Sequence, residues 1–189
     1  MTTSRSRPFP KTVVLVGLMG SGKSSVGRRL ARHLGLPFVD ADSEIAEAAG
    51  CSIEDIFEVY GEIAFREGER RVISRLLEGE PKVLATGGGS WIDRQTREKV
   101  AEHAISVWLR AELEILFKRI GRRGGRPLLK DVDPKTKLEQ LMVERYPVYA
   151  RADITVDTGD EPPENTVNQI LDALGDFDVA AAEGDEKRT

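Results

Sequence analysis

The sequence predicts an α/β fold in which helices cover a five-stranded parallel sheet. An apolar run, Val13–Val16, is typical of a buried strand, and four further short apolar segments follow along the chain. Between these segments, apolar residues recur every three or four positions, as they do on one face of a helix. Strands that alternate with helices in this way usually lie parallel in one sheet.

The first expected strand leads directly into a glycine-rich loop. Residues 17–24 read Gly-Leu-Met-Gly-Ser-Gly-Lys-Ser and match the phosphate-binding spacing G-x-x-x-x-G-K-[S/T], the P-loop. Glycines let backbone N–H groups turn toward a phosphate, Lys23 adds a full positive charge, and Ser24 offers a hydroxyl to Mg²⁺. A helical repeat follows as far as Gly35. The motif therefore has the strand before it and the helix after it that phosphate binding needs.

Two aspartates follow the second expected strand, which begins at Phe38. Side chains alternate along an extended segment, so Asp40 and Asp42 are expected to point the same way. One carboxylate can then help to hold Mg²⁺, and the other can accept a hydrogen bond from a substrate hydroxyl. The alternative is that Asp42 or Ser43 caps a helix that starts at Glu44.

A pair of opposite charges lies in the next helical region. Ser52 is expected to begin a helix that Gly61 interrupts, and a longer helix then runs to about Glu78. Within it Arg66 and Glu69 lie three positions apart, on one helix face. An arginine held by a carboxylate presents its planar fork in a fixed position, which suits a substrate carboxylate. An ordinary exposed ion pair is the alternative.

Three consecutive glycines follow the third expected strand, 82–86. The N–H groups of Gly87, Gly88 and Gly89 could donate to substrate oxygens because no side chain keeps a ligand away. A plain flexible turn is the alternative. In open α/β sheets ligands bind at the carboxyl ends of the strands, so the P-loop, the aspartates and these glycines are expected to meet there.

An arginine-rich segment stands out in the second half of the chain. After a helix over 93–103, a strand over 104–109 and a helix over 110–120, residues 119–131 combine arginine with glycine. Such a loop suits a mobile lid that closes over a triphosphate, with Arg126 supplying charge to the moving phosphoryl group. A solvated basic loop is the alternative.

The remaining residues complete the expected sheet. A helix begins at Asp133-Pro134 and ends near Pro147, a fifth strand covers 154–156, and a last helix includes 167–174. We expect one domain over 11–175.

The flanking segments 1–10 and 176–189 are expected to lack fixed structure. The net charge of −4 argues against a general nucleic-acid-binding protein. A single cysteine, no apolar stretch of membrane-spanning length and no recognisable signal peptide favour the cytoplasm, without membrane contact.

The chain resembles the shikimate kinases over roughly residues 11–175. The resemblance rests on the P-loop, Asp40-Ala41-Asp42, Phe65-Arg66 with Glu69, Gly87-Gly88-Gly89, Arg126-Pro127-Leu128-Leu129, and Arg145 with Tyr146 and Tyr149. It implies a three-layer α/β/α P-loop fold with strand order 2-3-1-4-5. It also implies Mg²⁺-dependent transfer of the γ-phosphate of ATP to the 3-hydroxyl of shikimate, in aromatic amino-acid biosynthesis, by a monomer.

The resemblance assigns roles to matching residues. ATP binding is implied for Gly20, Ser21, Gly22, Lys23, Ser24, Ser25, Arg119 and Arg126, with Arg119 near the adenine. Mg²⁺ binding is implied for Ser24 and Asp40. Shikimate binding is implied for Asp42, Arg66, Gly87, Gly88, Gly89 and Arg145, and catalysis for Lys23, Asp42 and Arg126. The loop 159–164 matches the family poorly and is left unassigned.

Two other functions compete with this prediction. A gluconate kinase shares the P-loop and also phosphorylates a hydroxyl of a small acid, but it is not expected to combine the Asp-x-Asp, arginine and triple-glycine motifs. A non-enzymatic ATP-binding regulator would bind ATP without turnover. The presence of Lys23, Ser24, Asp40, Asp42 and Arg126 argues against it, because each catalytic position carries a competent residue.

Overall fold

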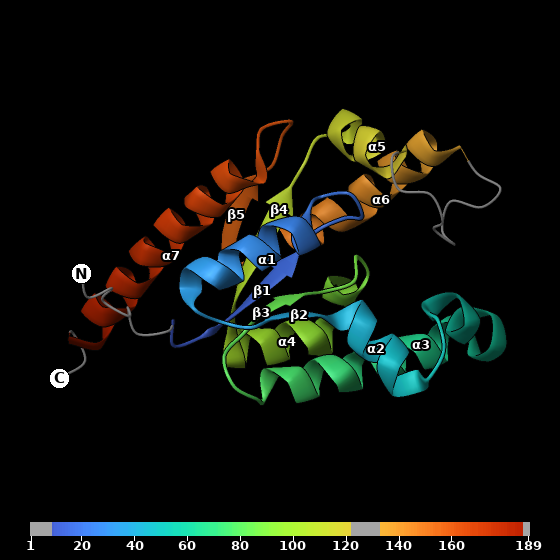
Figure 1. Ribbon diagram of the computed structural model, residues 1–189, viewed down its shortest axis with the longest axis horizontal. Coiled ribbons are helices and arrows are strands. Elements are labelled where there is room, and N and C mark those ends of the chain that lie inside the picture. The colour runs from blue at the N-terminus through green and yellow to red at the C-terminus, as the bar shows by residue number, and fades with distance from the viewer. Residues whose placement is uncertain (1–8, 122–132, 187–189) are drawn as a thin grey trace.

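Five parallel strands form one sheet in the order β2-β3-β1-β4-β5 (Figure 1). The structure, a computed structural model, describes residues 9–121 and 133–186. The middle strand is completely buried, because helices cover both faces of the sheet. The predicted fold class and strand order are confirmed. The strands are β1 (Thr12–Val16), β2 (Phe38–Asp40), β3 (Val83–Ala85), β4 (Ala104–Arg110) and β5 (Ile154–Asp157).

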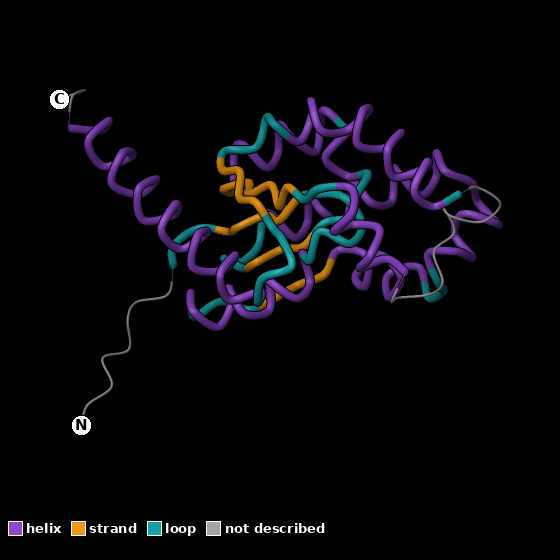
Figure 2. Tube along the Cα trace, turned by 90° about the horizontal axis from the view of Figure 1, so that it is seen from above, coloured by secondary structure: helices purple, strands orange, loops and turns teal. Residues whose placement is uncertain are grey.

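Successive side chains of β1 enter two different cores. Val13 and Leu15 pack with helices α1 (Lys23–Leu34) and α7 (Pro163–Glu186) on one face of the sheet. Val14 and Val16 pack on the other face, where α3 (Ile53–Leu77), α4 (Arg94–His103), α5 (Leu113–Gly121) and α6 (Pro134–Tyr149) contribute apolar side chains. The alternation along a strand thus produces the three layers that Figures 1 and 2 show.

A third and smaller core joins helix α2 (Ala41–Ala49) to the first half of α3. Its buried members are Ile45, Ile56 and Phe65. The first half of α3 begins with a capping box between Ser52 and Asp55. Gly61, with φ 79°, then interrupts the helix, as the sequence predicts. We call α2 and the residues of α3 up to Phe65 the small lobe. A 3-10 helix, η1 (Ser90–Ile92), precedes α4.

Two helices continue beyond their predicted ends. Helix α6 passes through Pro147 and ends at Tyr149, because Tyr146 and Tyr149 pack against Trp108 with ring centroids 4.9 and 5.9 Å away. Helix α7 continues to Glu186, whereas the sequence predicts an unfolded tail after Gly175. Its last part contains consecutive alanines, which have the highest helix propensity.

Some predictions concern residues that the structure does not describe. These are residues 1–8, the segment 122–132 with Arg126, and residues 187–189. Phe9 belongs to the segment predicted to be unstructured, yet its N–H donates to Leu34 O and its side chain packs against the α1 core. Within residues 9–121 and 133–186, no helix is long and apolar enough to cross a membrane.

Candidate functional site

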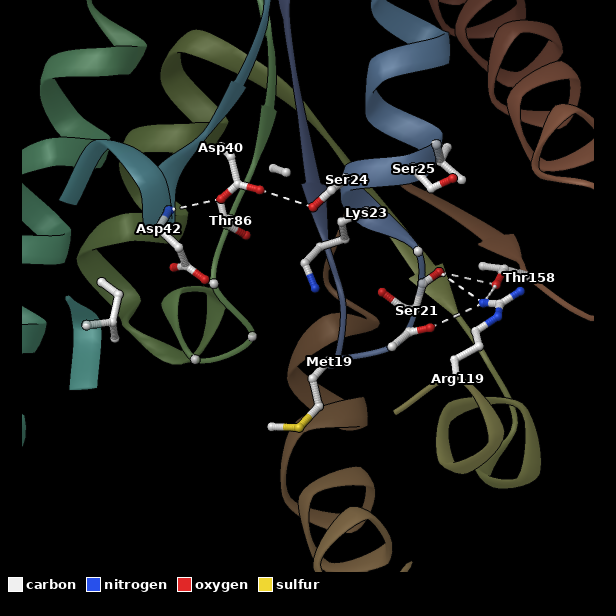
Figure 3. A pocket seen from close by; sticks show the side chains of 18 of the residues that line it. Met19, Ser21, Lys23, Ser24, Ser25, Asp40, Asp42, Thr86, Arg119 and Thr158 are labelled. Carbon is white, nitrogen blue, oxygen red and sulfur yellow. Dashed lines mark hydrogen bonds between the residues drawn. The ribbon is translucent and has the colours of Figure 1, made fainter. Parts of the chain in front are cut away.

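A cavity of about 760 Å³ opens at the carboxyl ends of the central strands. The P-loop, β2 and the glycines after β3 bring their polar residues to it, while α3, α5 and α6 each add an arginine. Figure 3 shows Lys23 between Asp42 on one side and Arg119 on the other. The predicted residues that line it are Gly20, Ser21, Gly22, Lys23, Ser24, Ser25, Asp40, Asp42, Arg66, Gly87, Gly88, Gly89, Arg119 and Arg145.

The P-loop wraps tightly around the start of α1. Gly17 and Gly22 have φ values of 143° and 97°, which favour glycine, and a Cβ on Gly17 would lie 2.8 Å from a backbone oxygen of β4. Lys23 Nζ donates to Gly17 O at 2.8 Å and to Leu18 O at 3.0 Å. The ammonium is therefore held over the loop, at the position where a phosphate would meet the N-terminus of α1.

Asp40 joins the P-loop to helix α2. Its Oδ2 accepts from Ser24 Oγ at 3.0 Å, and its Oδ1 accepts from the N–H of Asp42 at 3.1 Å (Figure 3). The prediction of one extended segment through both aspartates is wrong, since β2 ends at Asp40 and Asp42 lies in the first turn of α2. The alternative cap at Asp42 or Ser43 is wrong as well, because Asp40 is the N-cap. Both aspartates nevertheless line the cavity.

Arg66 belongs to a buried network rather than to an exposed ion pair. Its Nη1 lies 2.7 Å from Glu69 Oε2, and Glu69 is only 3 % exposed. The other carboxylate oxygen of Glu69 accepts from Ser90 Oγ at 2.5 Å. A buried carboxylate that is paired on both oxygens fixes the guanidinium, whose Nη2 also lies 3.5 Å from Glu62 Oε1, and Arg66 lines the cavity.

The triple glycine is tightly packed and is not a plain flexible turn. A Cβ on Gly87 would lie 2.8 Å from Asp42 Oδ1, and a Cβ on Gly89 would overlap the Arg66 guanidinium. Glycine is thus required for these two charged groups to approach the backbone.

Two side chains of helix α6 bind the carbonyl oxygen of the middle glycine, Gly88. Arg145 Nη1 donates to Gly88 O at 3.0 Å, and Tyr149 Oη donates to the same oxygen. Trp91 Nε1 donates a third hydrogen bond between these segments, to Val148 O at 3.1 Å. The backbone after β3 and the last turn of α6 therefore form one hydrogen-bonded unit.

Arg119 closes the other end of the cavity. Its Nη1 donates to Thr158 Oγ1 at 2.8 Å and to the carbonyls of Gly20 and Ser21 at 3.3 and 3.4 Å, and its Nη2 donates to Gly159 O. It thus connects the P-loop to the segment after β5. The sequence left this segment unassigned, although its place at a strand end was an available signal. Its cavity-lining residues are Thr158, Glu161, Pro163 and Thr166.

The cavity also has an apolar wall at the small lobe, which the sequence did not predict. Ile53, Phe57 and Phe65 line the cavity, and the two phenylalanine rings lie 4.4 Å apart between centroids. Ile53 and Phe57 lie four positions apart, the spacing of an apolar helix face. That spacing does not distinguish residues that face a cavity from residues that face a core.

Comparison with known proteins identifies shikimate kinases as relatives of this chain. The family model described as shikimate kinase matches residues 19–175. A shikimate kinase of Paramagnetospirillum magneticum is 58 % identical over 164 residues, which is 87 % of this chain and 84 % of that protein. The solved structure of a shikimate kinase from Acinetobacter baumannii, in complex with shikimate, has a TM-score of 0.85 and 37 % identity, and it covers 88 % of this chain and 94 % of that one.

The solved structure of a gluconokinase from Sinorhizobium meliloti bears on the alternative prediction of a gluconate kinase. Its structure covers 90 % of this chain and 95 % of its own, but the TM-score is 0.56 and the identity 25 %. The architecture is shared, whereas the likeness to the shikimate kinases is much greater in sequence and in structure.

Proposed function

The chain belongs to the shikimate kinase family, and on that premise we propose how its cavity carries out the reaction. The enzyme transfers the γ-phosphate of ATP to the 3-hydroxyl of shikimate, giving shikimate 3-phosphate and ADP for aromatic amino-acid biosynthesis. One observation carries the residue roles: Lys23, Asp42, Arg66 and Arg145 line the same cavity. The cavity therefore joins a proposed phosphate-binding end, at Lys23, to a proposed carboxylate-binding end, at Arg66 and Arg145.

The P-loop end accepts ATP. Backbone N–H groups from Gly20 to Ser25 meet the phosphates, and Lys23 exchanges its contacts with two neutral carbonyls for anionic phosphate oxygens. Arg119, tied to the segment after β5, flanks the nucleoside end of the cavity. Arg126 lies outside the described residues, and its role in stabilising the charge of the moving phosphoryl group is proposed from the sequence.

The small-lobe end accepts shikimate. Arg66 and Arg145 pair with the carboxylate, and the N–H groups of the triple glycine bind beside them. Two arginines offset the repulsion between this anion and ATP and hold the ring in one orientation. Asp42 accepts the hydrogen bond of the 3-hydroxyl. As the oxygen–phosphorus bond forms and the bond to the ADP oxygen breaks, the hydroxyl proton passes to the Asp42 carboxylate.

Ser24 and Asp40 fit a magnesium site. A hydroxyl and a carboxylate oxygen lie 3.0 Å apart beside the P-loop, and both are hard oxygen ligands of the kind that Mg²⁺ takes alongside phosphate and water. Bound there, Mg²⁺ would neutralise charge on the β- and γ-phosphates. The monomeric state, the cytoplasmic location and a catalytic domain over 11–175 are proposed from the sequence.

Changing Asp40 to asparagine is expected to weaken the metal site. Asparagine still caps α2 but lacks the negative charge, so the Mg²⁺ concentration for half-maximal rate should rise by about ten- to a hundredfold. Titration of the rate with Mg²⁺ at saturating ATP measures this effect. Asp93→Asn changes the N-cap of α4, outside the cavity, and should leave the requirement unchanged. Equal Mg²⁺ dependence in the Asp40 variant and the parent would remove Asp40 from the site.

Changing Arg66 to alanine is expected to weaken shikimate binding. The KM for shikimate should rise by about a hundredfold, because the variant loses a charged hydrogen bond and leaves Glu69 buried without that partner. The KM for ATP should change little. Steady-state kinetics with each substrate varied in turn separate the two effects.

Two controls accompany this variant. Arg71→Ala removes an exposed arginine that pairs with Glu67 at 3.5 Å, and it should leave the KM for shikimate unchanged. The parent chain should phosphorylate shikimate but neither gluconate nor a nucleoside monophosphate. An unchanged shikimate KM in Arg66→Ala would show that this arginine does not bind the acid.

A further inference from the structure

The carbonyl of Gly88 is held by two side chains from one helix. Arg145 and Tyr149 lie four positions apart on α6, so they project from the same face one turn apart. The guanidinium of Arg145 and the hydroxyl of Tyr149 both donate to Gly88 O. A carbonyl oxygen has two lone pairs, and these two donors occupy both.

This double contact sets the orientation of one peptide unit. Because the peptide between Gly88 and Gly89 is planar and trans, its N–H points opposite to its C=O. Neither glycine has a side chain to restrict rotation of that unit. Its orientation also matters to Arg66, whose guanidinium lies against the α-carbon of Gly89. The two donors on α6 therefore fix the backbone between both proposed carboxylate-binding arginines.

Tyr149 is well suited to act as a permanent donor. The side chain is fully buried, with its ring 5.9 Å from Trp108 and 6.2 Å from Tyr146 between centroids. Burial raises the pKa of the Tyr149 phenol to about 12, so the hydroxyl keeps its proton throughout the neutral range. This packing restricts the torsions of the side chain, and the hydroxyl, which donates to the Gly88 carbonyl, also interacts directly with the Arg145 side chain.

We propose that Tyr149 is a positioning residue for shikimate binding. Its hydroxyl holds the Gly88 carbonyl, and through that carbonyl it holds Arg145 and the Gly88–Gly89 peptide in the geometry that receives the acid. Tyr149 is absent from the residues that line the cavity and acts only through these groups. The inference rests on the proposed roles of Arg145 and the triple glycine.

A neighbouring tyrosine provides a matched comparison. Tyr146 lies on the same helix, packs its ring 4.9 Å from Trp108, and donates its hydroxyl to the carbonyl of Ala111. Tyr146 and Tyr149 thus share the donor group, the helix and the aromatic neighbour. They differ in burial, since Tyr146 is only partly buried, and in the carbonyl that they hold, since Ala111 lies between β4 and α5 and does not line the cavity.

Tyr149→Phe and Tyr146→Phe in the full-length chain test the proposal. Each variant loses one hydroxyl and keeps its ring, and the Tm of each measures what the lost hydroxyl costs in stability. Tyr149→Phe should raise the KM and the calorimetric Kd for shikimate by about three- to tenfold, the effect of one lost hydrogen bond, with kcat and the KM for ATP within about twofold. Tyr146→Phe should leave all three kinetic values unchanged. An unchanged shikimate KM in Tyr149→Phe, or equal changes in both variants, would overturn the proposal.

Arg145→Met separates this proposal from the function on which it rests. A raised shikimate KM in Arg145→Met with an unchanged KM in Tyr149→Phe overturns the positioning role alone. An unchanged KM in Arg145→Met overturns the carboxylate assignment itself. In the double variant, the Tyr149→Phe effect should shrink markedly, because the group that it positions is gone. Full additivity of the two effects would count against the proposed route through Arg145.

Discussion

Lys23→Met is expected to lower kcat by about a thousandfold, the scale found when an enzyme loses one preorganised group that stabilises transition-state charge. The ammonium sits over the P-loop, 2.8 and 3.0 Å from two of its carbonyls. Negative charge spreads over the phosphoryl oxygens during transfer, and Lys23 is the proposed protein cation in that position. Methionine keeps much of the length and apolar volume of the side chain but removes the charge.

The measurement is kcat for shikimate phosphorylation, together with ATP binding by calorimetry. Because the backbone N–H groups of the P-loop remain, ATP affinity should fall far less than turnover. Lys99→Met, which removes a surface lysine paired with Glu78 at 3.1 Å, should leave kcat unchanged. A Lys23 variant that retains more than a tenth of the parent kcat would contradict the proposed role.

Asp42→Asn is expected to lower kcat by about a hundred- to a thousandfold, within the usual range for loss of a general base. Asparagine is nearly the same size and can still contact the hydroxyl, but it cannot accept the proton. Asp42 packs closely against Gly87, so the variant should keep the geometry of the wall while losing its charge.

Single-turnover rates and the shikimate KM distinguish proton acceptance from simple orientation. A large fall in rate with a modest rise in KM supports the base, whereas a raised KM alone would leave Asp42 as a binding residue only. Glu44→Gln is the matched control, since Glu44 lies in the same turn of α2 but pairs outward with Arg75 at 3.1 Å. Its rate should match the parent.

Local motifs explain why the sequence alone predicted so much of this fold. The P-loop joins a strand to a helix within a few residues, and the apolar segments identify all five strands of the sheet. Glu69 shows the limit of such motifs. Its spacing from Arg66 indicated a pair, but only the fold reveals that Ser90, distant in the sequence, fills the second carboxylate oxygen and that the pair is buried.

Tertiary contacts also account for the predictions that failed. Pro147 is a reasonable helix end by local rules, but aromatic packing against Trp108 extends α6 by two more residues, to Tyr149. The prediction of one extended segment through both aspartates was wrong because Asp40 accepts hydrogen bonds from Ser24 and from the N–H of Asp42, at the start of α2. Strand β2 therefore ends at Asp40. Neither partner follows from alternation along the chain.

The small lobe, at the proposed shikimate-binding end of the cavity, differs from the rest of the domain in how few residues it buries. Among the described residues, its cluster buries only Ile45, Ile56 and Phe65, while the sheet carries two far larger cores. Regions with few buried contacts open more readily than the body of a domain. Shikimate bound at this end of the cavity, as proposed, would add contacts to a lobe in which the polypeptide alone buries few apolar side chains. Amide hydrogen exchange in this lobe should slow when shikimate is added at constant pH, while exchange in β1 stays the same.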